Sequence, residues 1–253
     1  MKELILKITA AHSKDIFFMQ LFSTVCLVYA LFAGYSSFHW LVSFFIYFCT
    51  GCLGVTVTFH RYLSHKSYSM PKFFEYTFSL FGALGGTGSS LGWVALHRDH
   101  HKYSDGPMDP HSPRNGKVRL IFSQYNFSMN KWAVRDLISN RYHKLLHSYY
   151  HLVILAWALF WLWVGFEWFI FIVTVPVAIQ IWISTASNIL NHTTGYRNFE
   201  TPEKSTNNFI IALISWGEGW HNNHHMYPSR WNFKVKWWEF DPSSLIIRLI
   251  KTK

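Results

Sequence analysis

Two long stretches with almost no charged residues restrict the fold of this chain more than any other feature. Residues 16–59 contain no lysine, arginine, aspartate or glutamate, and residues 145–190 contain only Glu167. Each stretch can form two helices of about 20 apolar residues, the length that crosses a bilayer. Turns at "GYSSFHW" and "GFEW" divide them. We therefore predict an all-α integral membrane protein with four transmembrane helices, at residues 17–34, 40–59, 150–165 and 168–190.

The lysines and arginines predict which side of the membrane the loops face. All 23 lie in the N-terminal tail, between Arg61 and Lys144, or from Arg197 onward, and neither short turn holds one. Because these residues accumulate in cytoplasmic loops, we expect both termini and a helical cap (60–148 and 191–253) to be cytoplasmic. The net charge of +10 then reflects orientation and contact with anionic membrane lipid, and we expect no nucleic acid partner.

We expect one domain over residues 1–253, with its first span retained. The opening residues place charges on both sides of a short apolar stretch, which is unlike a signal peptide. The cysteines Cys26, Cys49 and Cys52 fall in predicted spans, where packing explains them better than redox chemistry.

The stretch Phe73–Leu96 is apolar enough to resemble a fifth span. A full crossing would place the histidines on its two sides in different compartments, and its Gly/Ser-rich centre suits irregular backbone covered by protein. We therefore predict a re-entrant or interfacial element that does not cross.

Nine histidines and one asparagine form the candidate metal site, and all fall at the predicted cytoplasmic side: His60, His65, His97, His100, His101, Asn188, His192, His221, His224 and His225. An H-x-x-H-H run on a helix can aim all three imidazoles at one place, because positions i, i+3 and i+4 span about 100°. Asn188 and His192 are one turn apart. His60 and His65 are about 140° apart on an ideal α-helix, which fits a helix end or two ligands that serve different metals.

The number of imidazoles indicates two metals. Burying nine of them without partners would cost a few kcal/mol each, and four ligands already saturate a structural zinc site. Imidazole binds Fe, Cu, Zn and Ni, so the ligands alone do not select the metal. Asp99, Asp105, Asp109 and Glu218 are either acceptors for the imidazoles or ordinary surface charges.

Six further histidines lie outside the candidate site. His111 is either a neighbour of the site or a turn residue, and neither interpretation is favoured. The other five show no partner pattern and are interpreted as interfacial residues: His12, His39, His143, His147 and His151.

Three segments together resemble the histidine boxes of the integral-membrane Δ9 fatty-acyl desaturases: "GVTVTFHRYLSHKSY", "WVALHRDHHKYSD" with "DPHSPRNG", and "GEGWHNNHH". The resemblance extends to the C-terminal "WWEFDPSSLIIRLI" and is strongest to the bacterial and cyanobacterial branch. It implies a non-haem di-iron centre held by the nine histidines, with Asn188 as a water-mediated ligand, O₂ as co-substrate and an acyl tunnel beneath the irons. The product expected is a cis double bond in a fatty-acyl chain, and the sequence leaves open whether coenzyme A, a carrier protein or a glycerolipid carries that chain. The haem-binding "HPGG" of fused cytochrome domains is missing, and "DGPMDPH" departs from the commoner acidic loop.

The electrons that this chemistry needs must come from another protein. No G-x-G-x-x-G follows a predicted strand, so we expect an external donor such as ferredoxin or a cytochrome-b5-type protein. Its docking site could include exposed cations of the cap, which equally could contact only phospholipid: Lys117, Arg119, Lys131, Arg135, Lys234 and Lys236.

Two other functions remain as alternatives. A membrane di-iron hydroxylase uses similar histidine boxes and would add oxygen rather than remove hydrogen. A metal transporter predicts ligands in the middle of the spans, whereas these histidines lie at one end.

Overall fold

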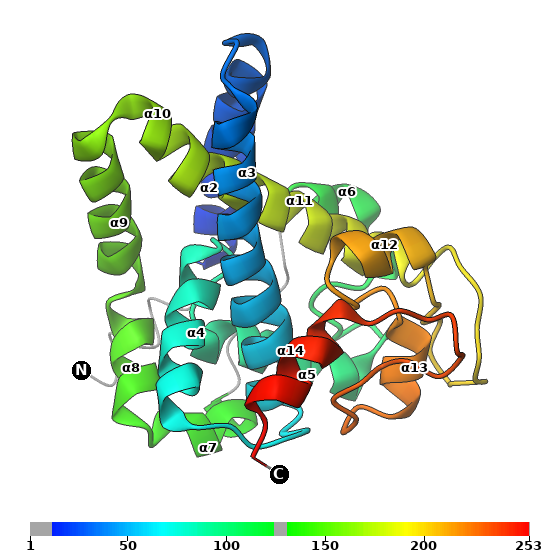
Figure 1. The fold of residues 1–253 in the computed structure, drawn as a ribbon. Helices are drawn as coiled ribbons and strands as arrows, with labels where there is room; N and C mark the ends of the chain where they lie inside the picture. Colours follow the sequence, from blue (N-terminus) through cyan, green and yellow to red (C-terminus); the bar gives the residue numbers. More distant parts are fainter. Residues whose placement is uncertain (1–11, 124–130, 253) are drawn as a thin grey trace.

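The computed structural model describes residues 12–123 and 131–252, and within them the chain is helical, with two isolated β-bridges (Figure 1). The N-terminal residues 1–11, whose lysines entered the orientation argument, lie outside the described residues. The elements in chain order are α2 (His12–Phe32), α3 (Ser37–Tyr47), η1 (Phe48–Ser64), α4 (Lys72–Leu84), α5 (Ser90–Tyr103), η2 (Pro113–Asn115), α6 (Lys117–Ile121), η3 (Lys131–Val134), α7 (Arg135–Ile138), α8 (Arg141–Ser148), α9 (Tyr150–Val164), α10 (Phe166–Trp168), η4 (Phe169–Thr174), α11 (Val175–Leu190), α12 (Phe209–Ile214), α13 (His221–Met226) and α14 (Pro242–Ile250).

Three continuous helical segments are long and apolar enough to cross a membrane: Asp15–Phe32, Ser37–Ser64 and Phe166–Leu190. They contain three of the four predicted spans. The predicted span at 150–165 is helical, but α9 has only 15 residues and bends by 67° from α8. At 1.5 Å per residue, 15 residues reach only about 22 Å. By length alone the described chain therefore has three spans, or up to four if the bent pair is one.

The second span continues past its predicted end because α3 runs directly into the π-helix η1. Helix α4 packs against η1 with almost no separation, since a Cβ on Gly54 would lie 2.2 Å from the backbone nitrogen of Gly82. Glycine is therefore required at Gly54. Gly82 of α4 in turn faces the ring of Phe59, which directly precedes the first histidine pair in η1. This contact therefore fixes the position of α4 against η1 beside that pair.

The stretch Phe73–Leu96 forms a broken pair of helices, α4 and α5. The backbone between them turns at Gly86 and Gly88, whose φ angles of 78° and 107° favour glycine. Ser89 then caps α5 by accepting a hydrogen bond from the Gly92 amide at 3.3 Å. This turn brings the histidines of α5 beside those of η1, so the prediction that the stretch does not separate them is confirmed.

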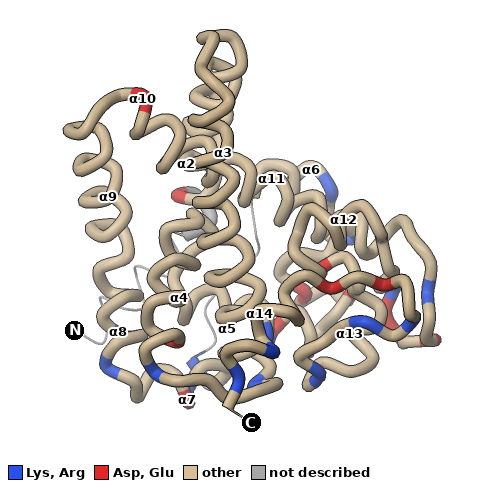
Figure 2. The backbone as a smooth tube through the Cα atoms, in the orientation of Figure 1, with Lys and Arg blue, Asp and Glu red and all other residues tan. Residues whose placement is uncertain are grey.

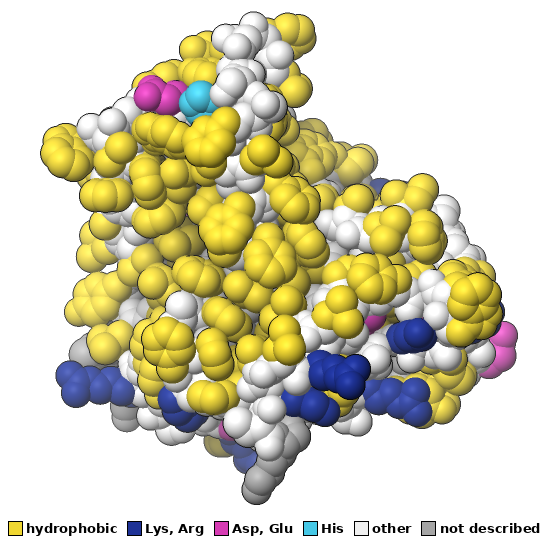
Figure 3. Space-filling view, in the orientation of Figure 1, with side chains coloured by type: hydrophobic (Ala, Val, Ile, Leu, Met, Phe, Trp, Pro, Cys, Tyr) yellow, Lys and Arg dark blue, Asp and Glu magenta, His cyan; other side chains and the backbone are white. Residues whose placement is uncertain are grey.

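Polar and apolar side chains divide between the two ends of the molecule. In Figure 3 hydrophobic side chains cover the upper part of the visible face, while lysines and arginines lie along its lower edge. Figure 2 shows most of these cations around α4, α8, α13 and α14. Cys26 and Cys52 are buried and all three cysteines are free, as packing within apolar helices predicts.

The interpretation of His143 and His147 as interfacial residues is wrong. Both side chains are buried, on the inner face of α8. His143 Nδ1 lies 3.0 Å from Ser90 Oγ and its Nε2 lies 3.1 Å from Glu75. His147 Nδ1 lies 2.5 Å from the Ser89 hydroxyl. These partners lie 53 to 68 residues away along the chain, so no local pattern could reveal them.

Candidate metal centre

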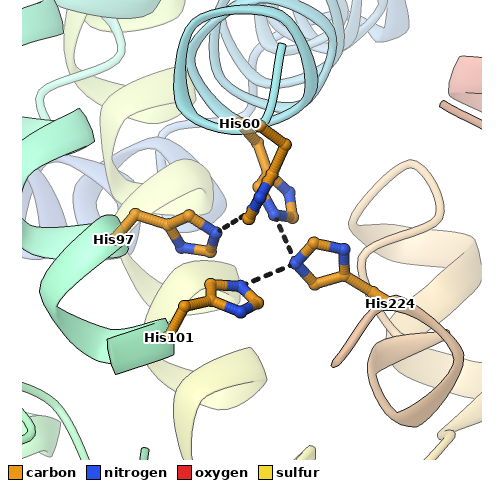
Figure 4. A group of neighbouring side chains, drawn as sticks. His60, His97, His101 and His224 are labelled. Carbon is orange, nitrogen blue, oxygen red and sulfur yellow. Dashed lines mark hydrogen bonds between the residues drawn. The ribbon is translucent and has the colours of Figure 1, made fainter. Parts of the chain in front are cut away.

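Five histidines from three helices converge on one point. They are His60 of η1, His65 directly after its end, His97 and His101 of α5, and His224 of α13, and one ligand atom of each lies within 4.8 Å of all the others. In Figure 4 the rings of His60, His97, His101 and His224 point toward a common centre. The Nε2 atom of His224 lies 2.9 Å from that of His60 and 2.8 Å from that of His101. We call these residues the five-histidine group.

The π-helix explains how His60 and His65 join the same group. The His65 amide donates to the His60 carbonyl at 3.2 Å, so the backbone repeats at five residues there. A π-helix has more residues per turn than an α-helix, so side chains five apart lie closer together around its axis; such segments are rare and often mark functional sites. The ring centroids of His60 and His65 are 5.1 Å apart. The alternative that the pair serves two different metals is therefore wrong, because it assumed α-helical geometry.

Four further histidines form a second group beside the first, and we call it the four-histidine group. It contains His100, His192, His221 and His225, again with ligand atoms within 4.8 Å of one another. The Nε2 atoms of His192 and His221 lie 3.0 Å apart, and those of His100 and His225 lie 3.2 Å apart.

The expectation that each H-x-x-H-H run aims all its rings at one place is wrong in detail. Residues i and i+4 of each run join one group and residue i+3 joins the other. Thus His97 and His101 enter the five-histidine group while His100 enters the four-histidine group. A single run spans about 100° of helix, wide enough to contact two adjacent centres. The two groups are neighbours, since the rings of His101 and His225 stack at 4.4 Å.

Carboxylates bind the outer nitrogens of four of these rings. Glu218 contacts Nδ1 of His60, and Asp109 lies 2.9 Å from Nδ1 of His100. The other two pairs are Asp105 with His192 at 3.2 Å and Glu203 with His225 at 3.3 Å. A carboxylate on Nδ1 fixes the tautomer that leaves the Nε2 lone pair facing inward, as in many metal sites. Three of the four acids expected from the sequence do this, and Glu203 was missed.

Burial favours the neutral form, the one that binds metals, in six of these rings. Burial lowers the pKa of His97, His100, His221, His224 and His225 well below 6.5. It lowers the pKa of His101 to about 4. Metals bind the neutral imidazole, so the sites need no deprotonation at pH 7. Two nitrogens bound to the same metal ion, each about 2.0–2.1 Å from it, can lie as close to each other as these Nε2 atoms do. Both groups therefore fit a metal ion.

Two arginines, the partly exposed Arg98 and the buried Arg61, hold the helices that carry the histidines, and the sequence analysis missed them. Arg98 donates to the carbonyls of Leu63 at 2.6 Å and Ser64 at 3.0 Å, and it pairs with Asp136 at 2.8 Å. It therefore satisfies the terminal carbonyls of η1 from α5. The sequence contained a signal, because an arginine follows the first histidine in both "HRYLSH" and "HRDHH".

Arg61 of η1 holds the C-terminal segment in place in a similar way. Its fully buried guanidinium pairs with Asp241 at 2.7 Å, donates to the Trp231 carbonyl at 2.8 Å and lies over the Phe233 ring at 3.8 Å. It also lies 3.6 Å from Glu218. Burial raises the pKa of Glu218 to about 8, although Arg61 opposes this. Arg61 thus ties η1 to the carboxylate that orients its neighbour His60.

A cavity of about 130 Å³ borders both histidine groups, and we call it the inner cavity. Its wall includes His60 and His97 from one group and His100 and His221 from the other. Asn188 lies in the same wall, two residues before the end of α11. Apolar side chains line other parts of it: Ile16, Val55, Trp93, Leu96, Ile181 and Ile183. His111, left open by the sequence, is buried in this wall and stacks on His100 at 4.2 Å.

Comparison with known proteins identifies the family. Residues 38–248 match the family model described as fatty acid desaturase. The chain belongs to the fatty acid desaturase family. This desaturase is therefore an oxidoreductase that introduces a double bond into a fatty-acyl chain, and its apolar helices agree with a membrane enzyme.

Named relatives cover most of the desaturase. An acyl-CoA C20 Delta5-desaturase of Anemone leveillei is 35% identical over 95% of this chain and 80% of its own length. An sn-2 palmitoyl-lipid 9-desaturase of Nostoc sp. (strain 36) is 32% identical over 94% of this chain and 86% of its own. An sn-1 stearoyl-lipid 9-desaturase of Anabaena variabilis is 32% identical over 85% and 83%. The resemblance seen in the histidine boxes is confirmed.

Proposed function

We propose that this desaturase is a di-iron enzyme that uses O₂ to form a cis Δ9 double bond in a saturated acyl chain. The observation that carries the proposal is that two groups of inward-facing imidazoles border a single cavity. The Δ9 position follows the printed names of the Nostoc and Anabaena relatives. The acyl group reaches the enzyme on coenzyme A or in a membrane lipid, the two carriers that the relatives' names contain.

Iron suits both groups, because imidazole is among the ligands that iron accepts and burial favours the neutral form of six of the rings. The five-histidine group would hold one iron. The four-histidine group would hold the other, and Asn188 in the adjoining cavity wall would complete it through a water molecule. When bound, the irons supply the O₂ chemistry that an unactivated methylene requires and that no protein side chain can perform. The overall reaction is R–CH₂–CH₂–R′ + O₂ + 2e⁻ + 2H⁺ → R–CH=CH–R′ + 2H₂O.

The chain's own residues position the substrate and the ligands. The apolar part of the cavity wall, with Val55, Leu96 and Ile181, would hold the acyl chain against His60, His97, His100 and His221. The depth to which the chain enters then selects the two carbons that react, and a displacement of about 1 Å can cost 10²-fold in rate. The Nδ1 carboxylates keep the imidazole tautomers fixed throughout.

The proposal includes four spans, with the bent pair α8–α9 as the third. A 15-residue α9 crosses if α8 continues it through the polar headgroup region. The lysine- and arginine-rich end would face the cytoplasm, together with both termini and the metal centre. Two electrons per double bond would come from an external donor such as ferredoxin or a cytochrome-b5-type protein.

The decisive experiment is expression in a desaturase-deficient host with a working donor. We expect a new monounsaturated fatty acid, two mass units lighter than its precursor, with the double bond located at Δ9 by mass spectrometry of a derivative. His97→Ala would abolish it, whereas Lys144→Ala, on an exposed position of α8, would not. A product heavier by one oxygen would instead establish the hydroxylase. Unchanged lipids in cells whose protein contains iron would contradict the proposal.

A further inference from the structure

Part of the cap carries a large exposed apolar surface. Helix α12 has the sequence FIIALI, and four of its six side chains are exposed, including Phe209 and Ile210. A second exposed stretch follows the last histidine, at residues 235–240, where the Trp237 side chain is 86% exposed. Large apolar patches usually mark contact with a membrane or with another protein. We call α12 and residues 235–240 together the apolar ledge.

The two parts of the apolar ledge form one surface, because the buried Trp220 packs beneath both. The centroid of a Trp220 ring lies 6.2 Å from that of Phe209 and 5.9 Å from that of Trp238. The indole nitrogen of Trp220 donates to the Phe240 carbonyl at 2.8 Å. In Figure 3 hydrophobic side chains gather over α12, with lysines and arginines below them. The ledge is therefore a single patch with cations along one side.

The apolar ledge continues the surface of a candidate membrane span. The Tyr47 hydroxyl donates to the Ile214 carbonyl, at the end of α12, at 2.6 Å. The ring centroid of Trp216 lies 5.7 Å from that of Phe44, whose side chain is itself exposed on α3. Tyr47 and Phe44 lie inside the apolar segment Ser37–Ser64, well before its histidine-bearing end. Helix α12 therefore lies alongside the apolar part of this span and not beyond its end.

A buried carboxylate holds the exposed turn at residues 235–240 in shape. Glu239 is fully buried and accepts hydrogen bonds from the Val235 amide at 2.6 Å and the Lys236 amide at 2.8 Å. It also accepts one from the side chain of Asn223 at 2.9 Å. Asn223 lies in α13, so the turn is joined directly to a helix of the metal centre. The exposure of Trp237 is thus a fixed property of the fold.

The exposed charges next to the apolar ledge are all positive. The two acidic side chains of residues 228–252, Glu239 and Asp241, are buried. The exposed charged side chains of this stretch are all basic: Arg230, Lys234, Lys236 and Arg248. Tryptophan and lysine together are typical of a membrane interface, where the ring enters the headgroup region and the ammonium contacts anionic lipid. An acidic protein would suit the cations, but it would not explain why the apolar surface joins that of a span.

We propose that the apolar ledge lies in the headgroup region of the leaflet nearest the metal centre, and that Lys234 and Lys236 bind anionic phospholipid there. The cap is then attached to the bilayer at a second place besides the spans, through the turn that Glu239 joins to α13. This narrows the expectation that all of residues 191–253 lies in the cytoplasm. It depends neither on the metal that the histidines hold nor on the reaction.

The test is hydroxyl-radical footprinting of the unsubstituted protein in phosphatidylcholine nanodiscs that contain phosphatidylglycerol, with radicals made by X-ray radiolysis of water. Trp132 of η3 is a matched internal control, because its side chain is 79% exposed, close to the 86% of Trp237. Trp163 of α9, which is 82% exposed, is the reference for a ring covered by lipid. We expect Trp237 to be oxidised at least severalfold more slowly than Trp132, at a rate nearer to that of Trp163.

A pair of substitutions tests the role of the charges. Lys234→Gln with Lys236→Gln should raise the oxidation rate of Trp237 severalfold in these nanodiscs, because each lysine contributes to attraction by an anionic surface. Arg141→Gln with Lys144→Gln on α8 is the matched control, since it removes two exposed charges far from the ledge in the sequence. Trp237 should stay protected in this control. An unchanged rate at Trp163 reports that each variant is folded and inserted.

Oxidation of Trp237 at the rate of Trp132 would overturn the proposal, because the ledge would then face water and be open to an acidic protein. An equal loss of protection in the α8 control would overturn the role given to the two lysines. So would equal protection in nanodiscs without phosphatidylglycerol. Failure of the proposed function is separate from these outcomes, since it would appear as a missing double-bond product from a protein whose footprint is as expected.

Discussion

Two sets of buried histidines lie in this molecule, and their ring nitrogens face different partners. In the nine-histidine centre the Nε2 atoms face one another, and four of the outer Nδ1 atoms face carboxylates. In the second set, His143 lies between Ser90 and Glu75 and His147 contacts Ser89. Burial is common to both sets. The two sets therefore differ in the partners of their ring nitrogens. In the candidate metal site the inner nitrogens face one another, whereas in the second set other side chains of the protein bind the ring nitrogens.

Replacing one member of each set tests this difference most strongly. We expect His224→Ala to reduce the iron content and to abolish the double-bond product, because His224 lies at the centre of the five-histidine group. His143→Ala should keep about two irons per chain. Metal analysis and fatty-acid analysis of both variants provide the check, and iron loss from both would show that the distinction is wrong.

Acid should affect the nine-histidine centre through the depressed pKa values. Because burial holds those pKa values below 6.5 in the folded state, the unfolded chain binds more protons as the pH falls. The metal-free protein should therefore be most stable above pH 6.5 and lose about 1.4 kcal/mol per pH unit for each such histidine below it. Iron retention should fall in the same direction. Thermal unfolding and iron content between pH 8 and pH 5 measure this, and a flat profile would contradict it.

Glu75 supports the second set, and its loss should affect stability rather than metal. Burial alone would raise its pKa, but hydrogen bonds from His143, Lys72 and Tyr62 outweigh burial and lower it to about 2. The carboxylate therefore stabilises the fold above about pH 4.5, and this contribution disappears as the pH falls toward 2. We expect Glu75→Ala to destabilise by about 3 kcal/mol. Denaturant unfolding gives this value, and Glu75→Gln should recover part of it.

Replacing a carboxylate that faces the nine-histidine centre should have the smallest of the predicted effects. Asp109→Asn keeps the shape of the side chain but removes the charge that faces Nδ1 of His100. Loss of such an outer partner typically lowers metal affinity 10- to 100-fold, so we expect a loss in that range with the fold intact. Competition with a chelator measures it. Asn115→Ala, which removes a donor to the backbone carbonyls of Gly106 and Asp109, separates loop loosening from loss of charge.

Much of the fold was predictable because its signals are local. The uncharged runs predicted the three long apolar helices. Helical spacing predicted that the histidines of α5 lie within one face of that helix, and likewise those of α13. The predicted span at 150–165 is less regular, because α9 bends by 67° from α8, and α8 has buried contacts with α4 and α5, such as that of His143 with Glu75. The fate of His143 and His147 was unpredictable for the same reason.

The assignment of individual histidines to the two groups also could not be predicted from the sequence. It depends on the π-helical repeat of η1, which brings the rings of His60 and His65 within 5.1 Å of each other, and on the packing that brings α5 beside α13. The arginines that hold these helices, Arg61 and Arg98, contact groups 34 to 180 residues away along the chain.

The sequence by itself determined that the chain is helical and membrane-bound, that it gathers imidazoles at one end, and that it resembles the desaturases. Those properties follow from residue type and short-range spacing. Tertiary structure alone decided which imidazoles converge in each group, and which buried histidines are instead bound by other side chains. These relations depend on distances between helices far apart in the chain, and hydropathy and helical period contain no information about such distances.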